Sequence, residues 1–196
     1  DWLLAQLDGP PPPPAQPEEL AITPIGTPAP TAPAAQPDAP PTLAPVPTAW
    51  ILTASVENHA ATAARKFSVI GIKERNRKRA LEIEPGDLIV LYLTKVMAFA
   101  GAIRVTGALY EDRKKIWPGE PRNPDSYPWR FPTEPVIVLP QERWLPAADL
   151  RTDLEHVQKW PAEHWKLAFQ GQLRTVSEHD ARLLLDRLTA QTEPSA

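Results

Sequence analysis

The residues of this chain that could do chemistry are of two kinds, tryptophans and a short basic cluster. Seven tryptophans occur in 196 residues, and each offers a flat indole face on which a nucleobase can stack. The basic cluster has five cations in seven positions: Lys73, Arg75, Arg77, Lys78 and Arg79. That density of one charge favours an anionic partner such as a phosphate backbone, with a merely solvated surface as the alternative.

The histidines and acidic residues form no recognisable catalytic or metal-binding pattern. Four histidines (His59, His156, His164 and His179) lack ligand spacing, and the chain has no cysteine. The sequence also contains no Gly-rich phosphate loop and no nucleophile elbow. We therefore predict a binding module rather than an enzyme, with no cofactor and no metal. The alternative is an enzyme that acts on a small molecule.

Proline usage divides the chain into segments. Of 26 prolines, 15 lie between Pro10 and Pro47, in a stretch with three charged and no aromatic residues. Such a composition buries too little apolar surface to offset the entropy of ordering, so residues 10–47 are predicted to be a disordered linker. Docking of its proline run on another protein is the alternative. We interpret residues 1–9 as the end of an upstream domain (or a disordered terminus), 48–190 as one folded domain and 191–196 as a tail.

Charge and hydropathy limit where in the cell the protein is expected. All 21 Lys and Arg residues follow Thr48, against 19 Asp and Glu residues there, so the folded segment is slightly basic. No apolar run approaches the roughly 20 residues that a membrane-spanning helix needs. No signal peptide is evident, and the absence of cysteine favours an intracellular setting. We therefore expect a cytoplasmic, bacterial-type intracellular protein without a membrane partner.

Hydrophobic patterning predicts a small β-barrel organised around one antiparallel hairpin. Residues 84–106 begin with a Pro-Gly-Asp turn and continue as two apolar runs joined by a short polar link. Gly101, inside the second run, predicts a β-bulge or a close backbone approach. Residues 49–53 are predicted to form the first strand. Residues 129–139 predict two further strand pieces, and their prolines confine the first piece to an edge or a bend.

Helix signals surround these strands. Ser55 or Asn58 is placed to cap a first helix of about ten residues. Free backbone N–H groups at that helix start are suited to bind a flat polar ligand, with pure capping as the alternative. Residues 147–157 predict a short helix. Ser177 and Asp180 resemble the capping box of a last helix.

Many short motifs also follow one another in a characteristic order over about residues 49–188. They are AWILTAS-x-EN, IGIKERN, IEPGDLIVLYLTK, AFAGAIRVTG, YED, IWPG, YPWRF and GQLR. In this order the sequence resembles the EVE domain, a member of the PUA-like superfamily and a relative of the YTH readers of methylated RNA. It departs from the family pattern at Ala49, His59 and Ile70, where aromatic residues are common. The resemblance implies an α+β fold, a small, twisted, mostly antiparallel β-barrel of PUA-like type wrapped by short helices.

The resemblance also implies a pocket for one modified base that is flipped out of its strand. Modified cytosine in DNA, such as 5-methylcytosine, is the favoured ligand, and the module would direct an upstream effector such as a modification-dependent nuclease in a restriction role. A reader of modified RNA is the alternative. The base-pocket candidates are Trp50, Thr53, Ser55, Asn58, Ile70, Gly71, Trp117 and Trp165. The phosphate-contacting candidates are Lys73, Arg75, Arg77, Lys78, Arg79 and Arg174.

Overall fold

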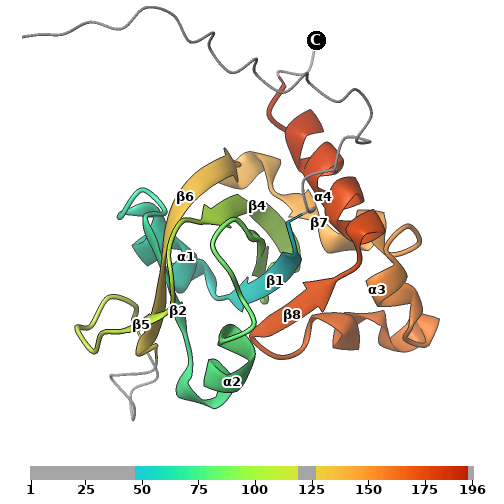
Figure 1. Cartoon of the computed structure of the whole chain (residues 1–196). Coiled ribbons are helices and arrows are strands. Elements are labelled where there is room, and N and C mark those ends of the chain that lie inside the picture. The colour runs from blue at the N-terminus through green and yellow to red at the C-terminus, as the bar shows by residue number, and fades with distance from the viewer. Residues whose placement is uncertain (1–46, 119–126, 194–196) are drawn as a thin grey trace, which may run out of the picture. The chain divides into compact units, whose positions relative to one another are not determined.

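The computed structural model describes residues 47–118 and 127–193 (Figure 1). In this part of the chain, eight strands form a mixed sheet that curls into a half-barrel, in the order β2-β6-β4-β3-β1-β8, with β5 beside β6 and β7 beside β4. The strands are β1 (Ala49–Ala54), β2 (Val69–Ile72), β3 (Leu88–Leu93), β4 (Ala98–Val105), β5 (Tyr110–Glu111), β6 (Trp129–Val138), β7 (Leu145–Pro146) and β8 (Leu173–Val176). The predicted upstream remnant, the predicted linker as far as residue 46 and residues 194–196 of the predicted tail lie outside the described residues.

Short helices surround the curled sheet (Figure 1). They are α1 (Val56–Ala63), α2 (Arg77–Ala80), α3 (Glu155–Gln158) and α4 (Glu178–Ala190), with the 3-10 helices η1 (Glu74–Asn76), η2 (Gln141–Arg143), η3 (Ala147–Leu150) and η4 (Ala162–Phe169). The predicted α+β, mostly antiparallel fold is confirmed, since β1 and β3 are the parallel pair and the other described strand pairs are antiparallel. No helix in the described ranges has the length and apolar character to cross a bilayer.

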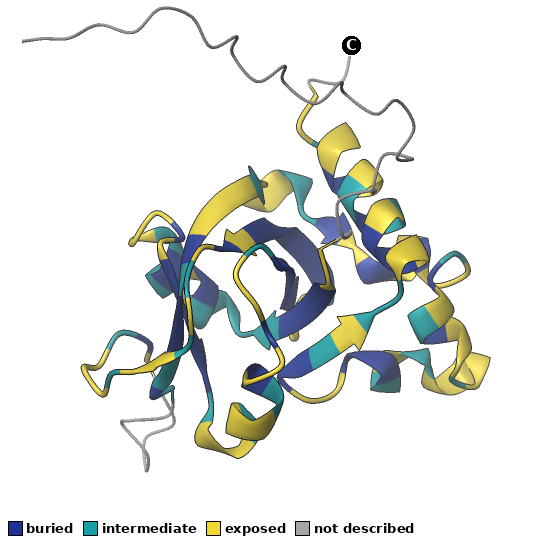
Figure 2. Cartoon of the chain, in the orientation of Figure 1, coloured by how far each residue is buried: buried dark blue, intermediate teal, exposed yellow. Residues whose placement is uncertain are grey.

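The predicted hairpin is β3 and β4, and it forms the centre of the core. Every residue of β3 is buried, because helices cover the outer face of the sheet while the curl covers the inner face (Figure 2). The pairing of β3 with β4 shifts register opposite Gly101, which confirms the predicted irregularity. A Cβ on Gly101 would lie 2.2 Å from the Ile137 carbonyl oxygen, so only glycine allows β6 to come this close.

The prediction of two strand pieces over residues 129–139 is wrong. The structure has one strand, β6, between β2 and β4 in the middle of the sheet. Its first part pairs with β2 as far as Pro132, and its second part pairs with β4 from Thr133. Pro135 lies where the register with β4 shifts, so the strand bends there. The two prolines therefore lie at the change of partner and at the bulge, where sheets tolerate a missing N–H donor.

Two helix predictions need correction in detail. Residues 147–157 do not form one helix but the two short pieces η3 and α3. Ser177 caps α4 as predicted, because its hydroxyl accepts a hydrogen bond from the Asp180 backbone N–H. The Asp180 carboxylate, however, does not complete a capping box. It is fully buried and accepts hydrogen bonds from the backbone N–H groups of Glu155 and His156, so it caps α3 instead.

Candidate functional site

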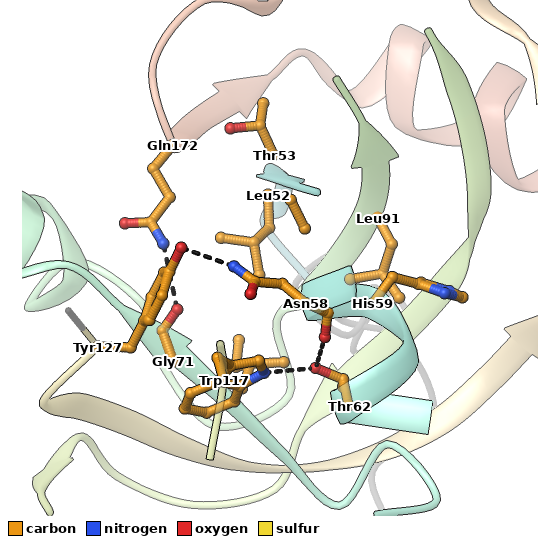
Figure 3. Close-up of a pocket in the computed structure, with 12 residues that line it drawn as sticks. Leu52, Thr53, Asn58, His59, Thr62, Gly71, Leu91, Trp117, Tyr127 and Gln172 are labelled. Carbon is orange, nitrogen blue, oxygen red and sulfur yellow. Dashed lines mark hydrogen bonds between the residues drawn. The ribbon is translucent and has the colours of Figure 1, made fainter. Parts of the chain in front are cut away.

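A cavity opens where β1 ends and α1 begins (Figure 3). Its volume is about 30 Å³, room for about two water molecules, so its walls must move apart to admit any larger ligand. Leu52 of β1, Ile70 of β2 and Leu91 of β3 supply the apolar part of its lining. The aromatic part comes from Trp117 and Tyr127, which lie on either side of residues 119–126.

Two residues of helix α1, Asn58 and Thr62, hold the two aromatic side chains in place. They are four positions apart and therefore lie on the same helix face. Asn58 Nδ2 donates a hydrogen bond of 2.6 Å to the Tyr127 hydroxyl. The Trp117 indole N–H donates a hydrogen bond of 2.8 Å to the Thr62 hydroxyl. This hydroxyl in turn donates to the backbone carbonyl oxygen of Asn58. Figure 3 shows this chain of bonds around the cavity. Ser55 caps the helix, because its hydroxyl accepts from the Asn58 backbone N–H. The start of α1 therefore fixes the cavity wall.

Gly71 of β2 allows the aromatic wall to lie against the sheet. A Cβ at this position would come within 2.4 Å of Trp117 Cζ3 and 2.8 Å of Tyr127 Cβ. Both contacts are far shorter than van der Waals distance, so any side chain at residue 71 would displace the wall. Trp117 is 5 % exposed and lies with its ring centroid 5.6 Å from that of Tyr127.

Gln172, immediately before β8, closes the gap between β2 and β8 beside the cavity. Its side-chain oxygen accepts hydrogen bonds of 2.8 Å from the Lys73 backbone N–H and from Asn76 Nδ2. Its side-chain nitrogen donates to the Gly71 carbonyl oxygen (Figure 3). One buried amide thus satisfies edge groups of β2 that a neighbouring strand would otherwise pair.

The cavity opens into a wider groove that carries most of the local positive charge. Lys73 and Arg75 line this groove, together with Lys95 from the β3–β4 turn and Lys166 from η4. Lys73 Nζ lies 5.5 Å from the centre of the Tyr127 ring, within the range of a cation–π contact. Glu57 is the acidic residue of the groove lining, and hydrogen bonds from its own backbone N–H and from Ser55 lower the pKa of its carboxyl group. The groove is therefore cationic overall.

Comparison with known proteins identifies the family. The model of the EVE domain matches residues 48–187. This chain belongs to the EVE domain family. A search of curated proteins finds no match.

Solved structures share the fold of this EVE domain at low sequence identity. The Pho92 YTH domain in complex with m6A is 17% identical, covers 80% of this chain and 92% of its own, and has a TM-score of 0.56. The YTH domain of Zygosaccharomyces rouxii MRB1 in complex with N6-methyladenosine RNA is 15% identical, with coverage of 75% and 91% and a TM-score of 0.51. A hypothetical protein from Leishmania major is 14% identical, with coverage of 76% and 98% and a TM-score of 0.52. At such identities the likeness establishes a shared fold.

The structure of the EVE domain brings most of the predicted base-pocket residues together. Thr53, Asn58, Ile70, Gly71 and Trp117 line the cavity. Ser55 lines the groove next to it and caps α1, so the predicted capping role is confirmed. Ligand binding at this helix start stays a prediction.

Two predicted pocket tryptophans lie elsewhere, which corrects those predictions. Trp50 is 1 % exposed in the core, and its indole N–H donates to Asp87 Oδ2 at 2.9 Å. Its neighbours on β1 are buried too, so the apolar pattern did not reveal which face of the strand each residue takes. Trp165 is half-buried on η4, edge-on to Phe169, and packs against the second half of the core rather than the cavity.

The predicted phosphate-contacting set divides in the same way. Lys73 and Arg75 line the groove, whereas the other four do not. Arg77 lies over the Trp129 ring at 4.5 Å, and Arg79 Nη2 is 3.5 Å from the Thr175 hydroxyl. Lys78 is exposed on α2 outside the groove lining, and Arg174 Nε donates to the Gln170 carbonyl oxygen. The positions of the basic residues from Arg75 to Arg79 follow from η1 and α2, which turn successive side chains in different directions.

Several lining residues were missed. Tyr127 and Gln172 occur in the YPWRF and GQLR motifs, whose order already carried the resemblance, and that was the available signal. Thr62 has no sequence signal beyond its position four residues after Asn58. His59 also lines the cavity, and its ring lies 5.5 Å from both Phe67 and Trp144. Burial lowers the pKa of His59, so the neutral imidazole is favoured in the fold. The described residues contain no cluster of His, Asp or Glu suited to a metal ion.

Proposed function

We propose that this EVE domain captures a single modified base, flipped out of a nucleic-acid strand, in the cavity beside α1. The observation that carries the proposal is the pair Trp117 and Tyr127, fixed by Thr62 and Asn58 at the end of a cationic groove. Flat aromatic side chains bind a base by stacking, and adjacent cations bind the phosphates on either side of it.

The energetics support capture of one base. Extruding a base from a duplex costs a few kcal/mol, while each aromatic stack contributes about 1–3 kcal/mol. One stack barely balances the cost, so the second aromatic residue and hydrogen bonds to the base edge are needed. The Asn58 side chain can supply those bonds. Its amide group has two N–H donors and one oxygen, and the Tyr127 hydroxyl accepts from one N–H only.

Our favoured ligand is a modified cytosine such as 5-methylcytosine in DNA, and the module would direct a linked effector such as a modification-dependent nuclease. This choice rests on the family resemblance. The second candidate is a modified base in RNA, and the YTH domains with the same fold that were solved with m6A or N6-methyladenosine RNA support it.

Equilibrium binding tests the proposal and separates its variants. The panel pairs each modified oligonucleotide with its plain counterpart, as DNA and as RNA, at two salt concentrations. We expect a preference for one modified strand of up to roughly 10–200-fold that persists at high salt. Equal loss of affinity for every strand as salt rises would indicate a phosphate binder without base recognition. Turnover of a small molecule without any strand would favour the enzyme alternative.

The cationic lining of the groove leads to a separate prediction about the salt dependence of binding. Arg75→Ala should reduce the slope of log K against log salt by roughly 0.7–0.9, the value for one phosphate contact, and leave the preference intact. Lys78→Ala is the matched control, because Lys78 is exposed close by and lies outside the groove lining. A change in slope for Lys78→Ala and none for Arg75→Ala would place the strand elsewhere.

A further inference from the structure

Arg130 of β6 is a charged residue buried to 2 % exposure directly behind the aromatic wall of the cavity. A buried guanidinium is costly unless all its donors find acceptors. Its partners therefore show what the chain holds together at this point.

The guanidinium joins the two segments that carry the aromatic residues. Nη1 donates to the Asp112 carboxylate, and Nη2 donates to the Lys114 carbonyl oxygen, both on the segment that leads to Trp117. Nε lies 3.5 Å from the carbonyl oxygen of Tyr127. Asp112 in turn accepts from the Lys114 backbone N–H at 2.9 Å, which closes a compact turn.

Trp117 and Tyr127 separate the cavity from a second, smaller hollow. Both residues line the two hollows, and Arg130 lines only the second one. The Arg130 guanidinium carbon lies 5.4 Å from the centre of the Trp117 ring. A planar cation thus supports the wall from the side opposite the cavity.

We infer that Arg130 is a positioning residue that fixes the aromatic wall formed by Trp117 and Tyr127, whose rings lie 5.6 Å apart and tilted at 59°, and through this wall sets the selectivity. This inference rests on the proposed function. Lysine cannot replace arginine here, because an ammonium is a point charge without the rigid planar fork that reaches a carboxylate and a carbonyl at once. Arg130 itself touches neither the cavity nor, by this inference, the base.

The test compares Arg130→Lys with Asp112→Asn, which keeps the arginine and weakens its fork. Binding of the preferred modified strand and of its plain counterpart is measured for each variant at two salt concentrations. In both variants the ratio of affinities for modified and plain strands should fall roughly tenfold, a change within the selectivity that a shaped pocket supplies. The slope of log K against log salt should stay unchanged. Arg104→Lys is the matched control, since Arg104 on β4 forms an exposed ion pair with Glu134 away from the cavity.

A cycle with Trp117→Phe separates positioning from general support of the fold. If Arg130 acts through Trp117, the double variant Arg130→Lys, Trp117→Phe should lose less of the modification preference than the product of the two single-variant losses. An undiminished preference in folded Arg130→Lys and Asp112→Asn overturns the inference, as does independent action of the two sites. Loss of folded structure in both variants, seen by circular dichroism, also overturns it, since Arg130 then supports the fold and not the selectivity. A wild-type domain without any preference would instead overturn the proposed function.

Discussion

Trp50 and Trp117 are both buried indoles whose N–H groups donate to an oxygen, but one lies in the packed core and the other lines a cavity. Trp50 donates to Asp87, which also accepts from the Glu84 backbone N–H, so this indole fastens β1 to the turn before β3. It is part of one of the two large hydrophobic clusters of the core. Trp117 donates to Thr62 and has a hollow on either side of its ring.

The difference shows that neither burial nor hydrogen bonding distinguishes a tryptophan inside the packed core from one that lines a cavity. Trp50 and Trp117 are 1 % and 5 % exposed, so burial would put both in the core. What differs is the space beside the ring. A side chain that lines a hollow keeps a face for a ligand, whereas a side chain inside a close-packed core has none to offer.

The largest expected effect is on the core side. Trp50→Ala should lower the free energy of unfolding by about 3–5 kcal/mol, because it leaves a large hole in the core and removes a hydrogen bond to buried Asp87. Urea denaturation measures this loss. The fraction of Trp50→Ala that stays folded should keep the wild-type ratio of affinities for modified and plain strands. A lost ratio would mean that Trp50 reaches the ligand and that the two regions are not separate.

Trp117→Ala should have the opposite profile. We expect its preference for the modified strand to fall to about one, since the loss of a base stack removes about 1–3 kcal/mol of binding. Its stability should fall less than that of Trp50→Ala, because the side chain already borders open space. Trp165→Ala is the matched control, since Trp165 packs edge-on against Phe169 outside the cavity lining. Binding titrations in which Trp165→Ala loses the preference and Trp117→Ala keeps it would contradict this assignment.

A smaller change tests the wall without removing it. Gly71→Ala places a methyl group within 2.4 Å of Trp117, so the ring must move. Overpacking of this kind costs about 1–3 kcal/mol of stability, and we expect the preference to drop several-fold as well. Gly107→Ala is the control, because its Cβ would crowd Pro132 Cγ at 2.7 Å and touches no cavity residue. Equal preferences in the two variants would show that the position of the wall does not matter.

The sequence predicted the scaffold because local patterns determine it. The β3–β4 hairpin, the irregularity at Gly101 and the caps Ser55 and Ser177 all follow from turn chemistry and apolar runs within about 20 residues. The β6 strand was missed for a tertiary reason. It changes partner from β2 to β4 after Pro132, and no local pattern encodes a change of partner.

The site was predicted in part, because its walls come from residues far apart in sequence. Asn58 and Gly71 lie in motifs with local meaning, a helix start and a strand glycine. Tyr127 joins them through a bond that spans 69 residues, and Gln172 through one that spans 101. The basic cluster was visible as composition, yet which of its side chains face the groove depends on how η1 and α2 turn, and spacing did not reveal it.

The smallest expected effect comes from pH and tests whether the two regions are independent. Burial lowers the pKa values of His59 and His156 below the ordinary value of 6.5. The unfolded chain therefore binds protons first as the pH falls, so stability is complete above about pH 6.5 and declines below it, until the folded-state pKa values are reached. Urea denaturation from pH 7.5 to 5 should show this slope.

His59→Phe should reduce that slope, because an aromatic ring fits between Phe67 and Trp144 and takes no proton. His164→Gln, on the exposed surface of η4, is the control and should leave the wild-type slope. The modification preference of folded protein should stay constant over the same range, because the hydrogen bonds that hold the wall join Asn58 to Tyr127 and Trp117 to Thr62 and involve no histidine. A preference that disappears near pH 6 while the protein stays folded would show instead that His59, on the same helix as Asn58 and Thr62, transmits its charge to the wall.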